Sequence, residues 1–336
     1  MKAIEIQNSF GLDSLKLTSR DKQEQGKGEV LIKLRAASLN YRDLMVVQGR
    51  YNPKQPLPLI PFSDGVGEVV AVGDGVTRVK VGDRVASIFF QKWLSGNLTK
   101  TAFHSTLGAP GDGVLAEYIV LHSDGVIPVP THLSDEEAAT LPCAAVTAWN
   151  ALITGGGLKA GDTVLIQGTG GVSLFALQFA KIAGARVIVI SSSDEKLEKA
   201  RELGATDRIN YKTTPNWDEQ VYQLTDGEGV DYVVEVGGAG TLAKSLRAVR
   251  LGGHISLIGV LTGTTAEINP MPILAKSVRV QGVYVGSREM FEAMNRAIAL
   301  HQLKPIVDRV FPFEEAREAL QYMESGAHFG KICLRF

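Results

Sequence analysis

A glycine-rich turn in the middle of the chain carries the residue types that point most directly to chemistry. It reads GTGGVS at residues 168–173, directly after a short apolar run and at the start of a helical pattern. The first glycine allows a tight turn, and the second lets a phosphate group approach the backbone. Free N–H groups and the positive end of the helix dipole then favour the anion. We therefore predict that Gly168, Gly170, Gly171 and Val172 bind a dinucleotide, although a generic strand-to-helix turn is the alternative.

The end of the following strand indicates which nucleotide is preferred. Sites for NAD place a carboxylate about 20 residues after the glycine turn, where it binds the ribose 2′-hydroxyl. Here the strand ends in Ser191, Ser192 and Ser193, and the first acid is Asp194. Hydroxyl groups and the nearby Lys196 suit a 2′-phosphate, which favours NADP(H) and leaves NAD(H) possible. The alternative is that the serines only cap a helix and Lys196 is an ordinary surface lysine.

The elements that must position this turn follow from the hydrophobic pattern. Residues 1–130 are rich in short strands and turns, which suggests a small barrel-like β domain. From about Ser134, which forms a predicted capping box with Glu137 before a helix over 138–152, apolar runs alternate with helical patterns. This rhythm is typical of a parallel sheet covered by helices on both faces. The pattern predicts strands at 30–34, 65–73, 79–85, 116–120, 164–166, 186–190, 230–236, 254–258 and 331–335, and helices at 172–183, 195–203, 288–300 and 313–325.

Composition excludes several classes of function. The 336 residues carry a net charge of −1 without a basic run, which disfavours a nucleic-acid or anionic-membrane surface. No stretch approaches the roughly 18 apolar residues of a membrane helix, and the first residues lack the apolar core of a signal peptide. The two cysteines, Cys143 and Cys333, are far apart in the sequence and fit reduced thiols in a cytoplasmic protein.

Several stretches together resemble the medium-chain dehydrogenase/reductase superfamily over essentially the whole chain. They are ASLNYRD at 37–43, PFSDGVGEV at 61–69, VGDRV at 81–85, GVLAEY at 113–118, GTGGV at 168–172 and FGKI at 329–332. The resemblance implies an α/β protein with two domains. A GroES-like, β-rich catalytic domain would comprise residues 1–130 and 286–336, and a doubly wound Rossmann domain would comprise 131–285.

The zinc alcohol dehydrogenases of this superfamily hold their catalytic zinc with a Cys, a His and a Cys, and an acid follows the His. In this chain Asn40 and Ser63 stand at the first two positions, Asp64 at the acid position, and only Cys143 matches a ligand. An amide and a hydroxyl are not normal zinc ligands. The four-cysteine structural zinc loop is also absent, because residues 91–110 contain no cysteine. We therefore predict no metal, and an inert Cys143.

The closer resemblance is to zinc-free quinone oxidoreductases and to the enoyl reductase modules of polyketide synthases. It implies that Lys196 and Tyr211 contact the 2′-phosphate, that Thr147 and Gly237 lie near the nicotinamide, and that Lys331 lies near the pyrophosphate. It also implies a homodimer that pairs through a strand over residues 278–285, for which an interior strand is the alternative.

Without a metal, hydride transfer needs an acceptor that is already activated, or hydrogen-bond donors aimed at the developing oxyanion. Quinones and α,β-unsaturated carbonyl compounds meet the first condition. The candidate donors are Tyr41, which is our preferred acid, Asn40 and Ser63. We predict a zinc-independent, NADPH-dependent oxidoreductase that acts on such a small molecule. The alternatives are an alcohol or aldehyde dehydrogenase and a nucleotide-binding protein with little catalysis.

Overall fold

The computed structural model describes all 336 residues, and the chain forms two compact units. The first unit combines Met1–Val146 with Gly286–Phe336, and the second is Thr147–Val285. The sequence analysis had begun the second domain at residue 131. Residues 131–146 instead belong to the first unit, because helix α3 (Asp135–Ala139) packs against strands of the first unit's large sheet.

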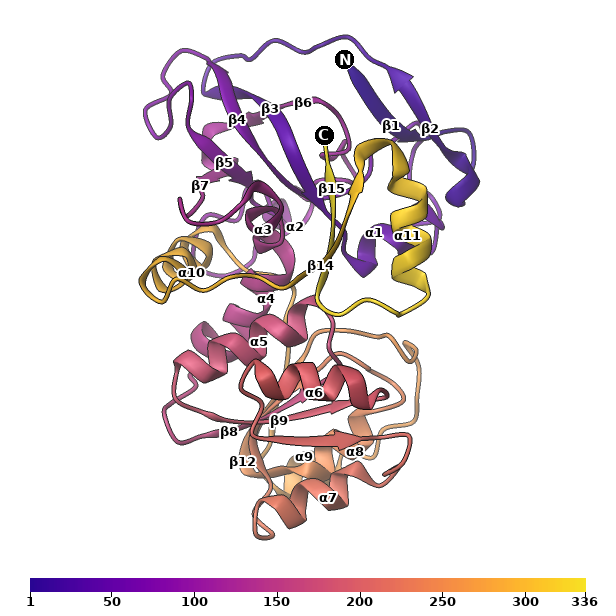
Figure 1. Cartoon of the computed structure of the whole chain (residues 1–336), viewed down its shortest axis with the longest axis vertical. Coiled ribbons are helices and arrows are strands. Elements are labelled where there is room, and N and C mark those ends of the chain that lie inside the picture. The colour runs from indigo at the N-terminus through magenta and orange to yellow at the C-terminus, as the bar shows by residue number, and fades with distance from the viewer. The chain divides into compact units, whose positions relative to one another are not determined.

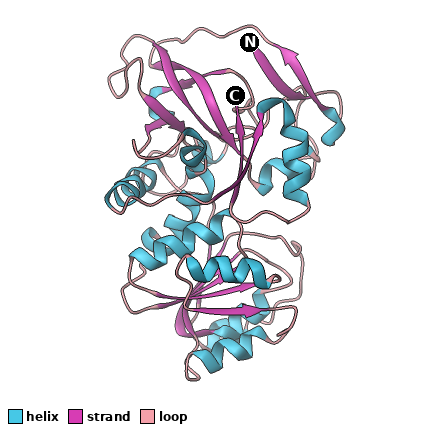
Figure 2. Ribbon diagram, in the orientation of Figure 1, coloured by secondary structure: helices cyan, strands magenta, loops and turns pink.

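The first unit is built on a seven-stranded sheet, mostly antiparallel, with the order β14-β15-β3-β4-β5-β7 and with β6 also pairing with β3 (Figures 1 and 2). A separate hairpin pairs β1 (Lys2–Ile6) with β2 (Leu15–Ser19). The strands of the large sheet are β3 (Glu29–Ser38), β4 (Asp64–Val72), β5 (Arg84–Ser87), β6 (Tyr118–His122), β7 (Val126–Pro128), β14 (Val307–Pro312) and β15 (Lys331–Arg335). The helices of this unit are α1 (Tyr41–Val47), α2 (Lys100–Phe103), α3, α10 (Arg288–Leu300) and α11 (Ala316–Glu324). The predicted GroES-like domain is confirmed.

The second unit is a six-stranded parallel sheet with the order β10-β9-β8-β11-β12-β13. Helices α5 and α6 cover one face and α7 and α8 the other (Figure 1), as the near-continuous apolar strands require. The strands are β8 (Thr163–Gln167), β9 (Arg186–Ser191), β10 (Asp207–Asn210), β11 (Val230–Glu235), β12 (Val249–Leu257) and β13 (Arg279–Gly282). The helices are α5 (Gly171–Ile182), α6 (Asp194–Glu202), α7 (Trp217–Leu224), α8 (Leu242–Ala248) and α9 (Met271–Ala275). The predicted Rossmann-type sheet is confirmed.

The helix predicted over residues 138–152 is interrupted. The capping box forms as expected, with Ser134 and Glu137 bonded to each other's backbone N–H groups. The chain then widens into π-type turns at Leu141–Ala145 and Asn150–Thr154, on either side of the short α4 (Val146–Trp149). Pro142 has no N–H to donate, and the N–H of Cys143 donates to Asp64. These two losses explain why a regular α-helix does not form there.

Next to the edge strand of the second unit, a chain of hydrogen bonds holds His254 neutral. Its Nδ1 accepts from Arg279, and its Nε2 lies 3.0 Å from Ser256 Oγ, which donates to the carbonyl of Ala151. Burial, with the nearby Arg279 guanidinium, lowers the pKa of His254 to about 4. A proton on Nδ1 would point at the Arg279 donor, so the network requires the neutral ring.

We therefore expect the stability of the protein to fall as pH drops from about 6.5 towards 4, because the unfolded chain then takes up a proton that folded His254 refuses. The contribution is about 2–3 kcal/mol. The measurement is urea unfolding of wild type and His254→Asn at pH 7.5 and pH 4.5. The difference between their unfolding free energies should shrink at the lower pH. A pH-independent difference would contradict the assignment.

Candidate functional site

The glycine turn lies at the carboxyl end of β8, where the strand order of the parallel sheet reverses and ligands of such folds bind. Gly168 has φ +72°, a left-handed conformation that disfavours a side chain. Gly170 differs, because its φ is −81° and a Cβ atom there would meet no protein atom within 4 Å. Protein packing therefore does not require a glycine at 170, whereas a ligand that approaches the backbone closely would.

Helix α5 begins directly after Gly170, and no side chain caps its first amides. Gly171 and Val172 form its first turn. Ser173, at the position of the third glycine, donates from Oγ to the carbonyl of Gln167 at 2.7 Å, so its small side chain joins the helix to the strand before the turn. An open cradle at Gly170 and an uncapped helix start fit the pyrophosphate of a dinucleotide.

The predicted 2′-phosphate residues lie around the carboxyl ends of β9 and β10. Ser191 ends β9 and is buried, and its carbonyl accepts from the N–H of Tyr211, whose side chain is exposed. Ser192 follows and is half-buried. Ser193 caps α6, because its Oγ accepts from the N–H of Lys196 at 3.3 Å, so the capping alternative holds for this serine.

The first acid after β9 is engaged elsewhere. Asp194 accepts from Asn210 Nδ2 at 2.8 Å. The structure thus joins Ser191 and Tyr211 through a backbone hydrogen bond. It places Lys196 in the first turn of α6, the helix that Ser193 caps. A contact of these residues with a 2′-phosphate stays a prediction.

A buried carboxylate that the sequence analysis missed organises the neighbouring loop. Glu235, at the end of β11, is fully buried. Its Oε1 accepts from the N–H groups of Gly237 and Gly238 at 2.8 and 2.9 Å, and from Thr241 Oγ1. Its Oε2 accepts from Gln167 Nε2 at 2.7 Å. Glu235 and Gln167 therefore connect the loops that follow β8 and β11.

This network also fixes Gly237, the residue predicted to lie near the nicotinamide. A Cβ at Gly237 would come within 2.2 Å of Thr241 Oγ1, so packing alone requires this glycine. Thr147, the other residue predicted there, is buried in α4. The signal that could have revealed Glu235 is an acid at the end of a largely apolar strand, two residues before a pair of glycines.

The first unit contains a second polar cluster, built from the residues at the expected metal position. Asp64, at the start of β4, is fully buried. Its Oδ1 accepts from Ser63 Oγ at 2.6 Å, and its Oδ2 accepts from the N–H of Cys143 at 3.0 Å. Burial raises the pKa of Asp64, while the Lys331 ammonium acts in the opposite direction. The hydrogen of the Ser63 hydroxyl is thus committed to Asp64.

Lys331 reaches this cluster from β15 and is only 4% exposed. Its Nζ donates to the carbonyl of Leu39 and, at 2.6 Å, to Asn40 Oδ1. The sequence analysis placed Lys331 near the pyrophosphate and did not foresee these partners. A pyrophosphate contact stays a prediction.

Asn40 and Tyr41 lie at the start of α1. The backbone N–H of Asn40 donates to Asp43 Oδ2 at 2.8 Å in a capping box, and the Asn40 side chain is 8% exposed. Burial raises the pKa of Asp43 to about 7, against the opposing effect of Arg42. Tyr41 is the most accessible of the predicted donors, with 37% of its surface exposed.

Arg42 stabilises the loop around residues 107–109. Its guanidinium donates to the carbonyls of Leu107 and Ala109 at 3.0 and 2.7 Å, and lies 4.0 Å from Asp43. Four aromatic residues near this loop, Phe62, Phe89, Phe90 and Trp93, are buried in the core, and the ring of Phe90 packs edge to face on those of Phe89 and Trp93.

Phe62, directly before Ser63, has a strained backbone. Its φ is +73°, a conformation that is costly for a bulky residue. Two glycines pack against it. A Cβ on Gly108 would come within 2.7 Å of the Phe62 N atom, and one on Gly113 within 1.9 Å of its carbonyl oxygen. The loop that Arg42 holds therefore maintains the backbone that presents Ser63 and Asp64.

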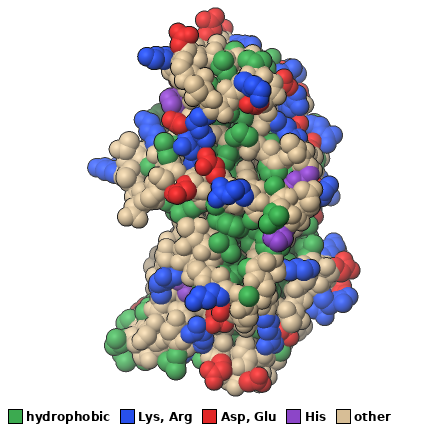
Figure 3. All heavy atoms as spheres, turned by 90° about the vertical axis from the view of Figure 1, so that its left-hand side faces the viewer, with side chains coloured by type: hydrophobic (Ala, Val, Ile, Leu, Met, Phe, Trp, Pro, Cys, Tyr) green, Lys and Arg blue, Asp and Glu red, His purple; other side chains and the backbone are tan.

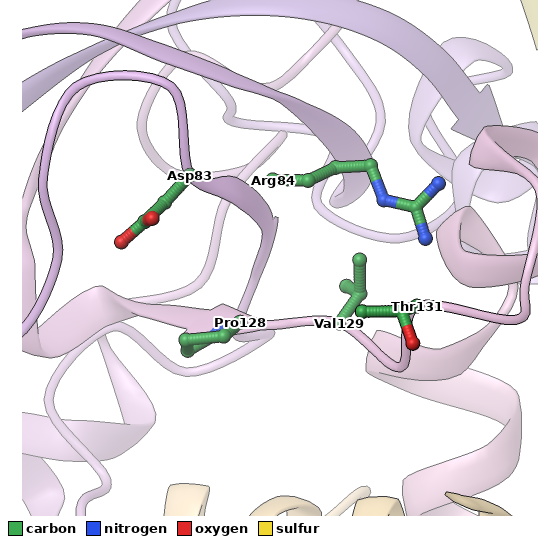
Figure 4. A pocket seen from close by; sticks show the side chains of 5 residues that line it. All are labelled: Asp83, Arg84, Pro128, Val129 and Thr131. Atoms are coloured by element: carbon green, nitrogen blue, oxygen red, sulfur yellow. The ribbon is translucent and has the colours of Figure 1, made fainter.

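A surface hollow elsewhere in the first unit is lined by Asp83, Arg84, Pro128, Val129 and Thr131 (Figure 4). Asp83 and Arg84 point in different directions there. Asp83 binds Lys80, and Arg84 donates to the carbonyls of Pro130 and Leu133. Because these charges already serve the fold, we do not place chemistry in this hollow. On the face shown in Figure 3, acidic and basic side chains are interspersed, and no helix is both long and apolar enough to cross a bilayer.

Comparison with known proteins places this geometry in a family. Residues 26–131 match the alcohol dehydrogenase GroES-like domain, and residues 171–299 match the zinc-binding dehydrogenase domain. A zinc-type alcohol dehydrogenase-like protein of Schizosaccharomyces pombe is 46% identical over 97% of this chain and 96% of its own length. The chain belongs to the medium-chain dehydrogenase/reductase superfamily. Like other members, it is an NAD(P)-dependent oxidoreductase.

Solved structures of the superfamily agree over the full length. A putative alcohol dehydrogenase from Sinorhizobium meliloti has a TM-score of 0.92 at 42% identity and covers 100% of this chain and 99% of its own. A mycobacterial protein in complex with NADPH has a TM-score of 0.85 at 28% identity, with both chains fully covered. Other similar proteins carry the names quinone oxidoreductase, at 28% identity, and acryloyl-coenzyme A reductase, at 30%.

The names of the matched domain and of the yeast relative imply zinc, but the residues at the expected site do not fit it. Asn40 Oδ1 accepts from an ammonium, and the Ser63 hydroxyl is bound to Asp64. Burial, together with Asp64, raises the pKa of the Cys143 thiol, which opposes the thiolate that zinc needs. No group of three or more His, Cys, Asp or Glu side chains is arranged to hold a metal.

Proposed function

We propose that this oxidoreductase is zinc-independent and uses NADPH to reduce a quinone or an α,β-unsaturated carbonyl compound. The observation that carries the proposal is the cluster around Asn40 and Ser63, in which an amide bound by the Lys331 ammonium and a hydroxyl bound to Asp64 stand where superfamily members with zinc have two of their metal ligands. The names quinone oxidoreductase and acryloyl-coenzyme A reductase among similar proteins support the same substrate class.

The nucleotide would be held by the second unit. The uncapped start of α5 and the open backbone at Gly170 suit its pyrophosphate, while Ser191, Lys196 and Tyr211 are the candidates for the 2′-phosphate. When bound, NADPH supplies a hydride. The chain must then stabilise the negative charge that develops on the acceptor oxygen and deliver a proton.

Two side chains are suited to this task. Tyr41 carries an accessible hydroxyl, and Asn40 has an amide that also hydrogen-bonds the carboxyl group of Asp64. Ser63 is less suited because its hydrogen is given to Asp64. A conjugated acceptor spreads the incoming charge, so one or two such donors suffice where an isolated ketone or aldehyde needs a stronger electrophile.

Turnover of one quinone, one enone and one alcohol or aldehyde pair with each nucleotide tests the proposal, together with zinc analysis of the dialysed protein. We expect NADPH-dependent reduction of the quinone or enone and no stoichiometric zinc. About one zinc per chain, with activity lost to a chelator and alcohols preferred, would establish the alcohol dehydrogenase alternative. Nucleotide binding without turnover of any of these compounds would indicate a binding protein.

NADPH should bind at least tenfold more tightly than NADH, since charge-assisted contacts to the 2′-phosphate contribute about 1.5–3 kcal/mol. Lys196→Ala should reduce this preference by lowering the affinity for NADPH alone. The matched control is Lys199→Ala, which removes another lysine of α6, one that pairs with Glu195. Fluorescence titration of both nucleotides gives the affinities. Equal affinities that Lys196→Ala leaves unchanged would mean that the serines and this lysine serve only the helix.

We further propose a homodimer formed through β13. This strand pairs with β12 alone and leaves its other edge open, and the exposed Leu274 of α9 precedes it. An open edge with apolar neighbours favours pairing with a second chain. Light scattering during gel filtration should give twice the mass of the chain. Gly282→Pro should weaken the dimer, because Val283 donates to β12 and the neighbouring N–H of Gly282 therefore faces the open edge. A monomer at micromolar concentration would contradict this proposal.

A further inference from the structure

The glycine turn divides the carboxyl edge of the parallel sheet into two sides. The candidates for the 2′-phosphate follow β9 and β10, on one side of β8, whereas β11 and β12 lie on its other side. A dinucleotide binds across such an edge, at the point where the strand order reverses, with one mononucleotide half on each side. The loops that follow β11 and β12 are therefore the ones available to the nicotinamide half.

These two loops are bonded to each other. The carbonyl of Gly237 accepts from both the N–H and the hydroxyl of Thr262, each at 2.8 Å. Thr262 Oγ1 in turn accepts from the N–H of Gly240 at 2.8 Å. A Cβ at Gly259 would come within 2.4 Å of the Val236 carbonyl oxygen, so the loops are also in close contact. A shift of the loop after β11 would therefore move the loop after β12 as well.

The carboxylate of Glu235 joins this pair of loops to the rest of the second unit. It accepts hydrogen bonds on both oxygens: Oε1 from the N–H groups of Gly237 and Gly238 and from Thr241 Oγ1, and Oε2 from Gln167 Nε2 and Ser245 Oγ. All of these partners are donors, so only a group that accepts in both directions satisfies them. Because Glu235 is fully buried, water does not replace a partner that is lost.

Gln167 extends the network to the glycine turn. Its Nε2 donates to Glu235, and its Oε1 accepts from the N–H groups of Val236 and Gly237 at 3.2 Å. Its backbone carbonyl accepts from Ser173, which joins α5 to the end of β8. Glu235 and Gln167 together thus set the distance between the start of α5 and the two loops on the other side of the turn.

We propose that Glu235 is a positioning residue for the nicotinamide half of the nucleotide: its carboxylate holds both loops at the distance from the glycine turn at which the nicotinamide is bound. This role rests on the nucleotide site proposed above. Glu235 is fully buried and acts only through the loops that it holds. The adenosine half, on the side of β9 and β10, should not depend on it.

Two ligands test this role without any turnover. NADPH spans both halves, whereas 2′,5′-ADP has the adenosine, the 2′-phosphate and one 5′-phosphate but no nicotinamide. In Glu235→Gln the new NH2 group faces donors whichever way the amide is turned, so at least two hydrogen bonds are lost. We expect NADPH affinity to fall by about tenfold or more, and 2′,5′-ADP affinity to change by less than about twofold. Titration calorimetry gives both affinities.

Asp231→Asn is the matched control. Asp231 lies near the other end of β11 and accepts from the N–H of Thr163, the first residue of β8, at 2.7 Å. Its carboxylate therefore also links β8 to β11, but at the edge of the sheet away from the glycine turn. This variant should lower the free energy of unfolding and keep both affinities. An equal loss of NADPH affinity in Asp231→Asn and Glu235→Gln would overturn the proposal.

The emission of bound NADPH reports on the ring directly, since a reduced nicotinamide emits more strongly when a protein holds it rigidly. At saturation, Glu235→Gln should enhance this emission less than wild type does. If urea unfolding shows that Glu235→Gln does not fold, Thr241→Val removes one donor and keeps the carboxylate. It should lower NADPH affinity by about threefold and leave 2′,5′-ADP affinity unchanged.

Equal losses for the two ligands, or unchanged NADPH affinity and emission, would overturn the role of Glu235. If the wild type reduces neither a quinone nor an enone, the proposed reaction fails, while these titrations still decide whether Glu235 positions the nicotinamide half.

Discussion

Replacing Gly170 by valine should abolish nucleotide binding and leave the fold intact. A Cβ at this position meets no protein atom within 4 Å, and its backbone is extended, which valine adopts readily. We expect the free energy of unfolding to change by about 1 kcal/mol or less, since the residue is a helix N-cap without a side-chain bond. The branched side chain would fill the space that a pyrophosphate needs, so NADPH affinity should fall by about a hundredfold or more.

Fluorescence titration with NADPH and urea unfolding give the two quantities. Gly111→Val is a matched control, because a Cβ at Gly111 also meets nothing within 4 Å and its φ is not positive. That variant should keep both stability and affinity. If Gly170→Val bound NADPH as well as wild type does, the turn would be a structural feature and the nucleotide would lie elsewhere.

Tyr41→Phe should lower turnover by about a hundredfold on an enone, and by less on a quinone. The hydroxyl is the most exposed of the predicted donors, and next to it Asn40 is held by Lys331. A donor that acts on charge present only in the transition state affects kcat and leaves nucleotide affinity unchanged. Quinones need less polarisation, so their reduction should depend less on this donor.

The measurement compares both substrates at saturating NADPH, with Tyr51→Phe as the control, since Tyr51 is equally exposed and loses the same hydroxyl. Undiminished turnover of both substrates by Tyr41→Phe would remove Tyr41 from the mechanism. The proton would then come from solvent.

The features that the sequence predicted well are local. The glycine turn, the Ser134 capping box and the Ser193 cap each depend on residues within a few positions of one another, so their spacing is visible in the chain. The alternation of apolar runs and helical patterns likewise predicted the parallel sheet. The wrongly continuous helix over 138–152 shows the limit of this approach. Its interruption involves a hydrogen bond from Cys143 to Asp64, which is 79 residues away.

The central contacts of the candidate site were hidden for the same reason. Lys331 and Asn40 are 291 positions apart, and no local pattern reveals that their side chains meet. The resemblance to a family identified Asn40 and Ser63 as residues at the expected metal position, but it did not indicate that Lys331 binds Asn40. Glu235 was overlooked because the sequence alone does not show which groups donate hydrogen bonds to a carboxylate at the end of a buried strand.

The separation of Lys331 from its partners bears on how the protein matures during synthesis. The segment 147–285, which forms the whole second unit, leaves the ribosome before Lys331 is added. Domains fold largely as units as they emerge, so this segment can reach its fold while the first unit still lacks β15. Until that strand is added, the amide of Asn40 has no cation to orient it. A growing chain can therefore complete the parallel sheet and its glycine turn before the polar cluster around Asn40 is assembled.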